Sequence, residues 1–164
     1  MITGLVLVER GVEALAVTLS HLVPGVAEGL VGDAVVIARR DDEDVARVAD
    51  ATGAALVVIG PGDDPWTAAA GIARRDWLLC LRDGDMPADG WIRALDRFTL
   101  TASGTGLPIG RLARPWRERL PALLEGRLHG PRLRPGDLVH RSRVAEPARA
   151  RVVRLPVGIV RDGG

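Results

Sequence analysis

Four short apolar segments alternate with three helical patterns in the first half of this 164-residue chain, and this alternation limits the fold more than any other feature. The apolar segments have strand length and cover residues 2–8, 34–38, 54–59 and 77–81. The helical patterns lie between them, over residues 11–22, 41–52 and 65–74. Because parallel strands need a long crossover connection, this order predicts βαβ units with right-handed crossovers. We therefore expect an α/β, Rossmann-like, three-layer sandwich with a mostly parallel central sheet.

Start and stop signals support the three helices. Gly53 follows the second helix, and Asp64-Pro65 provides an N-cap and a proline at the first position of the third. Pro24-Gly25 follows the first helix, and we expect it to end that helix near residue 22.

The fourth apolar segment leads into the candidate site. Trp77 to Leu81 form a continuous apolar run, which is typical of a strand covered on both faces. Arg82-Asp83-Gly84-Asp85 follows with turn chemistry, and Asp89 can cap the next helix. In open α/β sheets, ligands bind at the carboxyl ends of the strands, and two carboxylates spaced i, i+2 there suit a hard cation. Asp83 and Asp85 are therefore the predicted ligands of Mg²⁺ or Mn²⁺.

Three arginines also fall at predicted carboxyl ends of strands. Arg39 and Arg40 follow the second strand, and Arg82 ends the fourth. Their guanidinium groups could bind a diphosphate with two parallel hydrogen bonds. The alternative is that they pair with the acids at 41–44 and with Asp83.

Composition limits the class of protein. The chain is 47% hydrophobic and 26% charged, which are globular values, and its length suits one domain. Cys80 is the single cysteine, so a disulfide framework within the chain is excluded and a reduced compartment is expected. The apolar run at 2–8 has no basic residue before it and stops at Glu9, which argues against a signal peptide. We expect a cytoplasmic protein.

The charge is distributed unevenly. Residues 1–100 carry 16 acids and 9 arginines, a net charge of −7, whereas residues 101–164 carry 5 acids and 13 arginines, a net charge of +8. The two halves could attract each other within one fold. Alternatively, the basic half meets phosphate, on a nucleotide or at an anionic membrane surface, which would make a peripheral membrane contact. We expect no nucleic-acid partner.

The last third has weaker patterns. Residues 99–110 are small and polar and are predicted to form a loop. Residues 114–128 have a helical pattern with a kink at Pro121, and residues 136–141 and 151–160 are predicted strands.

Several ordered segments resemble family 2 glycosyltransferases, the GT-A fold enzymes that take a sugar from a nucleotide diphosphate sugar. They are LVLVERGVEALAVTLSHLVPG, ADATGAALVV, PWTAAAGIARRDWLLCL and MPADGWIRAL. The resemblance implies a single GT-A-like domain over residues 1–164, with a nucleotide-binding half at 1–100 and a basic, acceptor-side half at 101–164. It also implies a nucleotide sugar as ligand and Mg²⁺ or Mn²⁺ as cofactor.

The chain departs from the family pattern at its functional positions. Laid without gaps, the base-binding aspartate falls on Ala38, and the Asp-x-Asp metal motif falls on Arg82 and Gly84. A one-residue bulge would return Asp83 and Asp85 to the cation.

The catalytic residue stays unassigned, because no acidic pair matches the family's base and Glu146 is a poor substitute. Two alternatives to glycosyl transfer therefore stay open. One is a catalytically inactive GT-A domain that acts as a binding or regulatory module. The other is a nucleotidyltransferase of the molybdopterin-guanine type, because residues 84–87 (GDMP) resemble a motif of that family.

Overall fold

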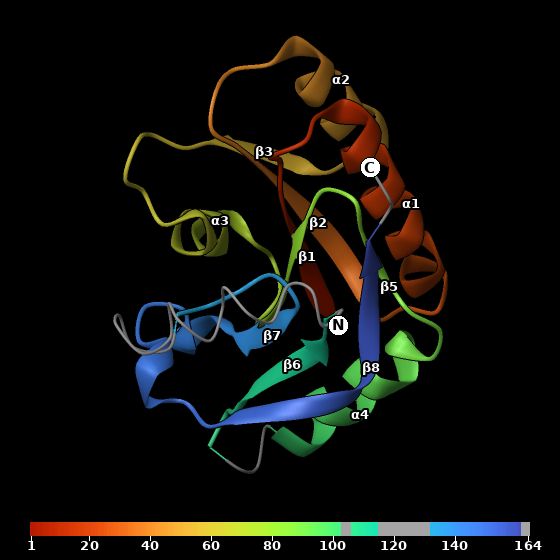
Figure 1. Cartoon of the computed structure of the whole chain (residues 1–164), viewed down its shortest axis with the longest axis vertical. Helices are drawn as coiled ribbons and strands as arrows, with labels where there is room; N and C mark the ends of the chain where they lie inside the picture. Colours follow the sequence, from red (N-terminus) through yellow and green to blue (C-terminus); the bar gives the residue numbers. More distant parts are fainter. Residues whose placement is uncertain (103–105, 115–131, 162–164) are drawn as a thin grey trace.

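The alternation of strands and helices folds around a single sheet in the computed structural model, which describes residues 1–102, 106–114 and 132–161 (Figure 1). Within these residues the sheet has eight strands in the order β3-β2-β1-β4-β7-β6-β8-β5. The strands are β1 (Ile2–Leu7), β2 (Val31–Ala38), β3 (Ala55–Val58), β4 (Trp77–Arg82), β5 (Asp85–Pro87), β6 (Ile109–Ala113), β7 (Asp137–His140) and β8 (Val152–Arg161). The helices are α1 (Val12–Ala27), α2 (Glu43–Thr52), α3 (Pro65–Ile72) and α4 (Trp91–Ala102), with 3₁₀ turns at Arg141–Arg143 and Pro147–Arg149.

The first half of the sheet is parallel, as the alternation predicts. β1 pairs in parallel with β2 on one side and with β4 on the other, and β2 pairs in parallel with β3. β1 is buried along its whole length and β4 over all but its last residue, which explains their continuous apolar sequences. The carboxyl ends of these four strands therefore share one edge of the sheet, at the top of Figure 1.

The second half is mixed. β7 is antiparallel to β4 and to β6, whereas β6 and β8 are parallel. β5 is antiparallel to the last part of β8. A partly buried ion pair joins β6 to β7, with Arg111 Nε 2.6 Å from the buried Asp137 Oδ1. The prediction of an α/β fold with a mostly parallel sheet is confirmed.

Helices cover both faces of the sheet and make the expected three layers. Residues of α1, α2 and α4 share one core cluster with the sheet, including Leu15, Val45 and Leu95. Trp66 and Ala69 of α3 belong to the cluster on the opposite face.

The predicted end of the first helix is wrong. α1 continues through Pro24 to Ala27, because the carbonyls of Pro24 and Val26 still accept hydrogen bonds from the N–H groups of Glu28 and Gly29. Gly29, with φ of 75°, marks the actual end.

The predicted loop at 99–110 is wrong at both ends. Residues 99–102 complete α4, and Ile109 begins β6. This strand was not predicted because Gly110 weakens its apolar pattern. Glycine is favoured at this position, since a β-carbon there would lie 3.0 Å from the ring of Phe98. The strands predicted at 136–141 and 151–160 are confirmed as β7 and β8, whereas the helix predicted at 114–128 falls almost wholly outside the described residues.

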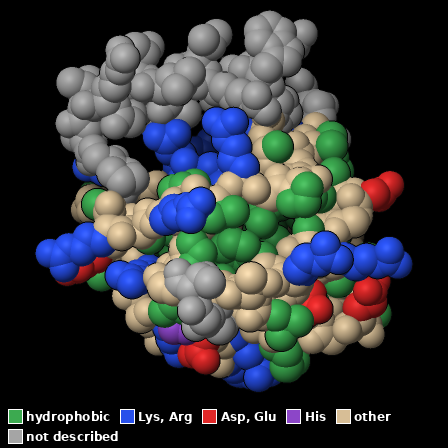
Figure 2. Space-filling view, turned by 90° about the horizontal axis from the view of Figure 1, so that it is seen from below, with side chains coloured by type: hydrophobic (Ala, Val, Ile, Leu, Met, Phe, Trp, Pro, Cys, Tyr) green, Lys and Arg blue, Asp and Glu red, His purple; other side chains and the backbone are tan. Residues whose placement is uncertain are grey.

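Seen from below, hydrophobic side chains gather at the middle of the molecule with arginines around them (Figure 2). Leu100 and Val160 are among the described hydrophobic residues that are more than half exposed. None of the described helices is long and apolar enough to cross a membrane.

Candidate functional site

A pocket of about 400 Å³ lies at the carboxyl ends of β1 and β2. We call it the rim pocket, and its lining consists of Val8, Glu9, Arg10, Gly11, Ala38, Arg39, Arg40, Asp42 and Val45. This is the edge of a parallel sheet at which ligands bind in α/β folds. Of the five site residues predicted from the sequence, Arg39 and Arg40 line this pocket.

The guanidinium groups of Arg39 and Arg40 are available to a ligand. Both residues are exposed, and neither makes a hydrogen bond or an ion pair with another described residue. The alternative that they pair with the acids at 41–44 is wrong for the described part of the chain. Asp42 instead caps α2, and Asp44 pairs with Arg47 at 3.1 Å.

Asp83 lies behind the rim pocket. Its Oδ2 accepts hydrogen bonds from the backbone N–H groups of Glu9, Arg10 and Gly11, at 3.0, 2.5 and 2.9 Å. Asp83 is only 1% exposed. It therefore contacts the loop that forms one wall of the pocket.

Asp85 holds two arginines from the C-terminal half. Its Oδ2 accepts hydrogen bonds from the Arg82 backbone N–H at 2.8 Å and from Arg114 Nη2 at 2.9 Å. Its Oδ1 lies 3.5 Å from Arg161 Nε. The turn after β4 is thus tied to the ends of β6 and β8.

Sequence reasoning missed Arg114 and Arg161. Arg161 follows a predicted strand by one residue, so its position at a strand end was a usable signal. Arg114 follows β6, a strand that was not predicted from the sequence, and was itself predicted to begin the helix at 114–128, so it carried no such signal.

Arg82 pairs with Glu9 rather than with Asp83. Arg82 Nε lies 3.3 Å from Glu9 Oε2, and both side chains are about one-third exposed. Arg82 therefore adjoins the rim pocket through Glu9 and does not line it.

Each of the two predicted metal ligands has one carboxylate oxygen without a hydrogen bond, and Arg161 Nε lies 3.5 Å from that of Asp85. Asp83 Oδ1 and Asp85 Oδ1 are buried and make no hydrogen bond. Within the described ranges, no group of three or more His, Cys, Asp or Glu side chains could hold a metal. Since Mg²⁺ is commonly bound by one or two carboxylates together with substrate phosphates and water, these two oxygens fit such an ion only in the presence of a phosphate ligand.

Two buried groups in the sheet have shifted pKa values. Burial raises the pKa of the Cys80 thiol well above its usual value, so Cys80 stays protonated and is a poor nucleophile. Burial also raises the pKa of Asp137, while its hydrogen bonds with Arg111 act in the opposite direction. Neither group belongs to the rim pocket.

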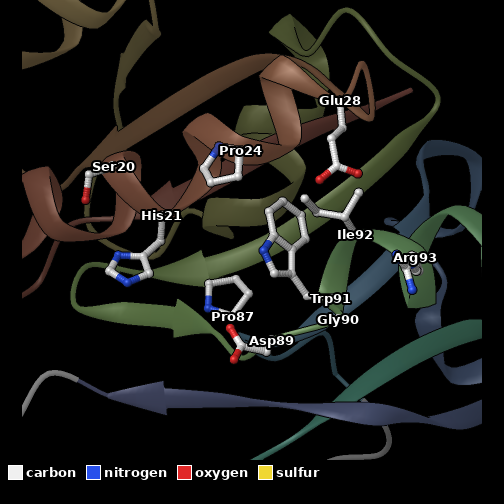
Figure 3. A pocket seen from close by; sticks show the side chains of 10 residues that line it. All are labelled: Ser20, His21, Pro24, Glu28, Pro87, Asp89, Gly90, Trp91, Ile92 and Arg93. Carbon is white, nitrogen blue, oxygen red and sulfur yellow. The ribbon is translucent and has the colours of Figure 1, made fainter.

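A larger groove of about 600 Å³ lies between α1 and the start of α4 (Figure 3). Its residues include His21 of α1, Glu28 directly after α1, and Trp91 of α4. Most of the Trp91 ring is buried, and a β-carbon at Gly25 would lie 2.5 Å from it. None of the site residues predicted from the sequence lines this groove.

Comparison with known proteins identifies the fold. No protein-family model and no curated protein matches the sequence. Among solved structures, glucosyl-3-phosphoglycerate synthase from Mycobacterium tuberculosis is similar with a TM-score of 0.69 and 15% identity, over 100% of this chain and 72% of that chain. Mannosyl-3-phosphoglycerate synthase from Rubrobacter xylanophilus has a TM-score of 0.63 and 14% identity, over 94% of this chain and 65% of that chain.

A mannosyltransferase from Pyrobaculum calidifontis, in complex with GDP-Man and Mn²⁺, has a TM-score of 0.56 and 11% identity, over 91% of this chain and 46% of that chain. The Mycobacterium tuberculosis enzyme is also known in complex with Mn²⁺ and UDP-glucose. The prediction of Mg²⁺ or Mn²⁺ agrees with the ion in these structures. At such identities the likeness establishes the fold, and the predicted GT-A-type fold is confirmed.

Proposed function

We propose that this protein is a glycosyltransferase-like protein that binds a nucleotide diphosphate sugar in the rim pocket and transfers the sugar to an acceptor. The pocket lies at the carboxyl edge of a GT-A-type sheet, where this fold class binds its ligands.

The observation that carries the proposal is that Arg39 and Arg40 line the pocket without other described partners. These two arginines are consecutive in the chain, and their guanidinium groups are not engaged with other described residues. A planar guanidinium group binds a phosphate through two parallel hydrogen bonds, so a pair of them suits a diphosphate.

Transfer of a sugar requires stabilisation of the departing diphosphate and a base for the acceptor hydroxyl. Mg²⁺ or Mn²⁺ would supply positive charge to the diphosphate. Its candidate protein ligands are Asp83 Oδ1 and Asp85 Oδ1, which lie outside the lining of the pocket. The rim pocket provides no comparable candidate for the base. Its two acids are engaged, since Glu9 pairs with Arg82 and Asp42 caps α2.

Because neither Glu9 nor Asp42 is available as a base, a second candidate function is also favoured. It is a GT-A domain that binds a nucleotide sugar without transferring it. Both candidates share the same nucleotide site. They differ only in turnover.

Calorimetric titration with UDP, GDP and CTP, each with and without Mn²⁺, tests the binding step. We expect a nucleoside diphosphate to bind, and the double substitution Arg39→Ala, Arg40→Ala to weaken its affinity by about tenfold or more, since hydrogen bonds to charged groups are lost. Arg47→Ala is the matched control, because Arg47 is an exposed arginine on α2 outside the pocket. Equal affinity in the double variant and the wild type would refute the site.

Two further measurements distinguish a glycosyltransferase from a nucleotidyltransferase and from a binding module. Tighter binding of CTP than of either diphosphate would favour a nucleotidyltransferase. Release of UDP or GDP from UDP-glucose or GDP-mannose would establish turnover, whereas binding without release would leave the binding module.

A further inference from the structure

Asp83 Oδ2 contacts the wall of the rim pocket formed by Glu9 to Gly11 from behind. The three backbone N–H groups of this segment all donate to Asp83 Oδ2. Asp83 does not line the pocket itself. Any influence of Oδ2 on a ligand in the pocket must therefore pass through this wall.

Neighbouring backbone contacts attach the same loop to the turn after β4. The Asp83 N–H donates to the Leu7 carbonyl at 3.0 Å, and the Gly84 N–H donates to the Ala14 carbonyl at 2.9 Å. Gly84 has a φ of 83°, and a β-carbon there would lie 2.5 Å from Arg10 Nη1. The turn and the wall are thus packed as one unit.

The start of α1 depends on the same carboxylate. Gly11 is the N-cap residue of α1, has a φ of 119° and provides no side chain to cap the helix. Asp83 supplies an acceptor and a negative charge at this helix end from another part of the chain. Asp83 therefore contributes to the position of the wall relative to the sheet through both the loop and the helix end.

We propose that Asp83 is a positioning residue of the rim pocket, which sets the affinity for a nucleoside diphosphate by holding the Glu9–Gly11 wall, with or without a bound cation. The proposal rests on the proposed function, because it takes the rim pocket as the nucleotide site. It adds a role for Oδ2 that is separate from cation binding through Oδ1.

Removal of the carboxylate leaves three donors without their acceptor. These partly buried N–H groups then need water or another acceptor, so we expect the wall to shift from its position in the wild type. Glu9 and Arg10, which line the pocket, move with it.

Two substitutions separate positioning from cation binding. Asp83→Ala removes the acceptor, whereas Asp83→Asn keeps an acceptor oxygen but loses the negative charge that a divalent cation needs. Asp89→Asn is the control, because Asp89 lies in the same acidic stretch but is exposed. UDP and GDP affinities are measured by calorimetry for each variant, in EDTA and in Mn²⁺.

We expect Asp83→Ala to weaken binding by about tenfold or more in EDTA, where no cation contributes, and by a larger factor in Mn²⁺, where a cation ligand is lost as well. Asp83→Asn should recover part of the affinity in both conditions, and Asp89→Asn should match the wild type. The proposal is wrong if Asp83→Ala lowers the nucleotide affinity only in Mn²⁺, or if the wild type binds nucleotide only with Mn²⁺. It is also wrong if Asp83→Asn binds as weakly as Asp83→Ala in Mn²⁺ but with wild-type affinity in EDTA.

Amide hydrogen exchange gives a readout that needs no ligand. In the wild type and in Asp89→Asn, the amides of residues 9–11 should be protected, and Asp83→Ala should lose this protection while the amides of β4 keep theirs. If Asp83→Ala does not fold, Asp83→Asn should show faster exchange at the same three amides. Unchanged protection there would overturn the proposal, whereas failure of every nucleotide to bind the wild type would overturn the proposed function instead.

Discussion

Replacement of Asp85 by Asn should destabilise the protein more than any exposed charge substitution. Asp85 is 1% exposed, and its carboxylate faces Arg114 at 2.9 Å and Arg161 at 3.5 Å. Breaking a buried ion pair costs about 3–5 kcal/mol when the remaining charge stays buried. Here the two arginine side chains are 19% and 29% exposed and can turn towards water, so we expect a smaller loss of about 2–3 kcal/mol.

Urea denaturation measures this loss. The midpoint should fall while the slope m stays unchanged, and the melting temperature should fall by roughly 4–12 °C for a chain of this size. A double-mutant cycle with Arg114→Met should give a coupling free energy of about 1 kcal/mol or more.

Glu146→Gln is the control for the Asp85 substitution. Its ion pair with Arg149 joins two side chains that are 59% and 75% exposed, so the expected change is below about 0.5 kcal/mol. A loss in Asp85→Asn no larger than that of this control, or a coupling free energy near zero, would refute the account of Asp85 as the residue that ties the two halves of the sheet.

Two glycine substitutions and the labelling of Cys80 give three further predictions. Gly84→Ala should destabilise the fold by about 1–2 kcal/mol in thermal denaturation, because φ is 83° and the added β-carbon meets Arg10; a neutral effect would contradict that conformation. Gly25→Ala should cost about 1–3 kcal/mol of unfolding free energy in urea, since the β-carbon would overlap the Trp91 ring, and a stabilised variant would show that the ring lies elsewhere. Cys80, buried and with a raised pKa, should react with a thiol reagent only as fast as the protein unfolds, and rapid labelling of the native protein would be inconsistent with its burial.

The part of the fold predicted from the sequence is the part with strong periodicity. β1 and β4 are buried on both faces, so their residues had to be continuously apolar, and the helices between them show one apolar face. β5 and β6 gave no such signal. β5 has three residues and exists through its pairing with β8, and β6 contains Gly110 against Phe98.

In the candidate site, too, some features were predictable from the sequence and others were not. Arg39 and Arg40 were predictable because a residue that follows a parallel strand must lie at the carboxyl edge. The partners of Asp83 were not, because they are backbone N–H groups, which every residue except proline carries. The contact of Asp85 with Arg114 joins residues that are 29 positions apart and depends on tertiary structure alone.

The most direct test of the nucleotide site is the NMR amide spectrum of the protein during titration with UDP and GDP. If the rim pocket binds the nucleotide, the amides of residues 8–11 and 38–42 should shift with a common, saturable dependence on nucleotide concentration, and those of His21 and Trp91 in the α1–α4 groove should stay in place. Shifts confined to the α1–α4 groove, or a spectrum unchanged by either nucleotide with and without Mn²⁺, would contradict this assignment.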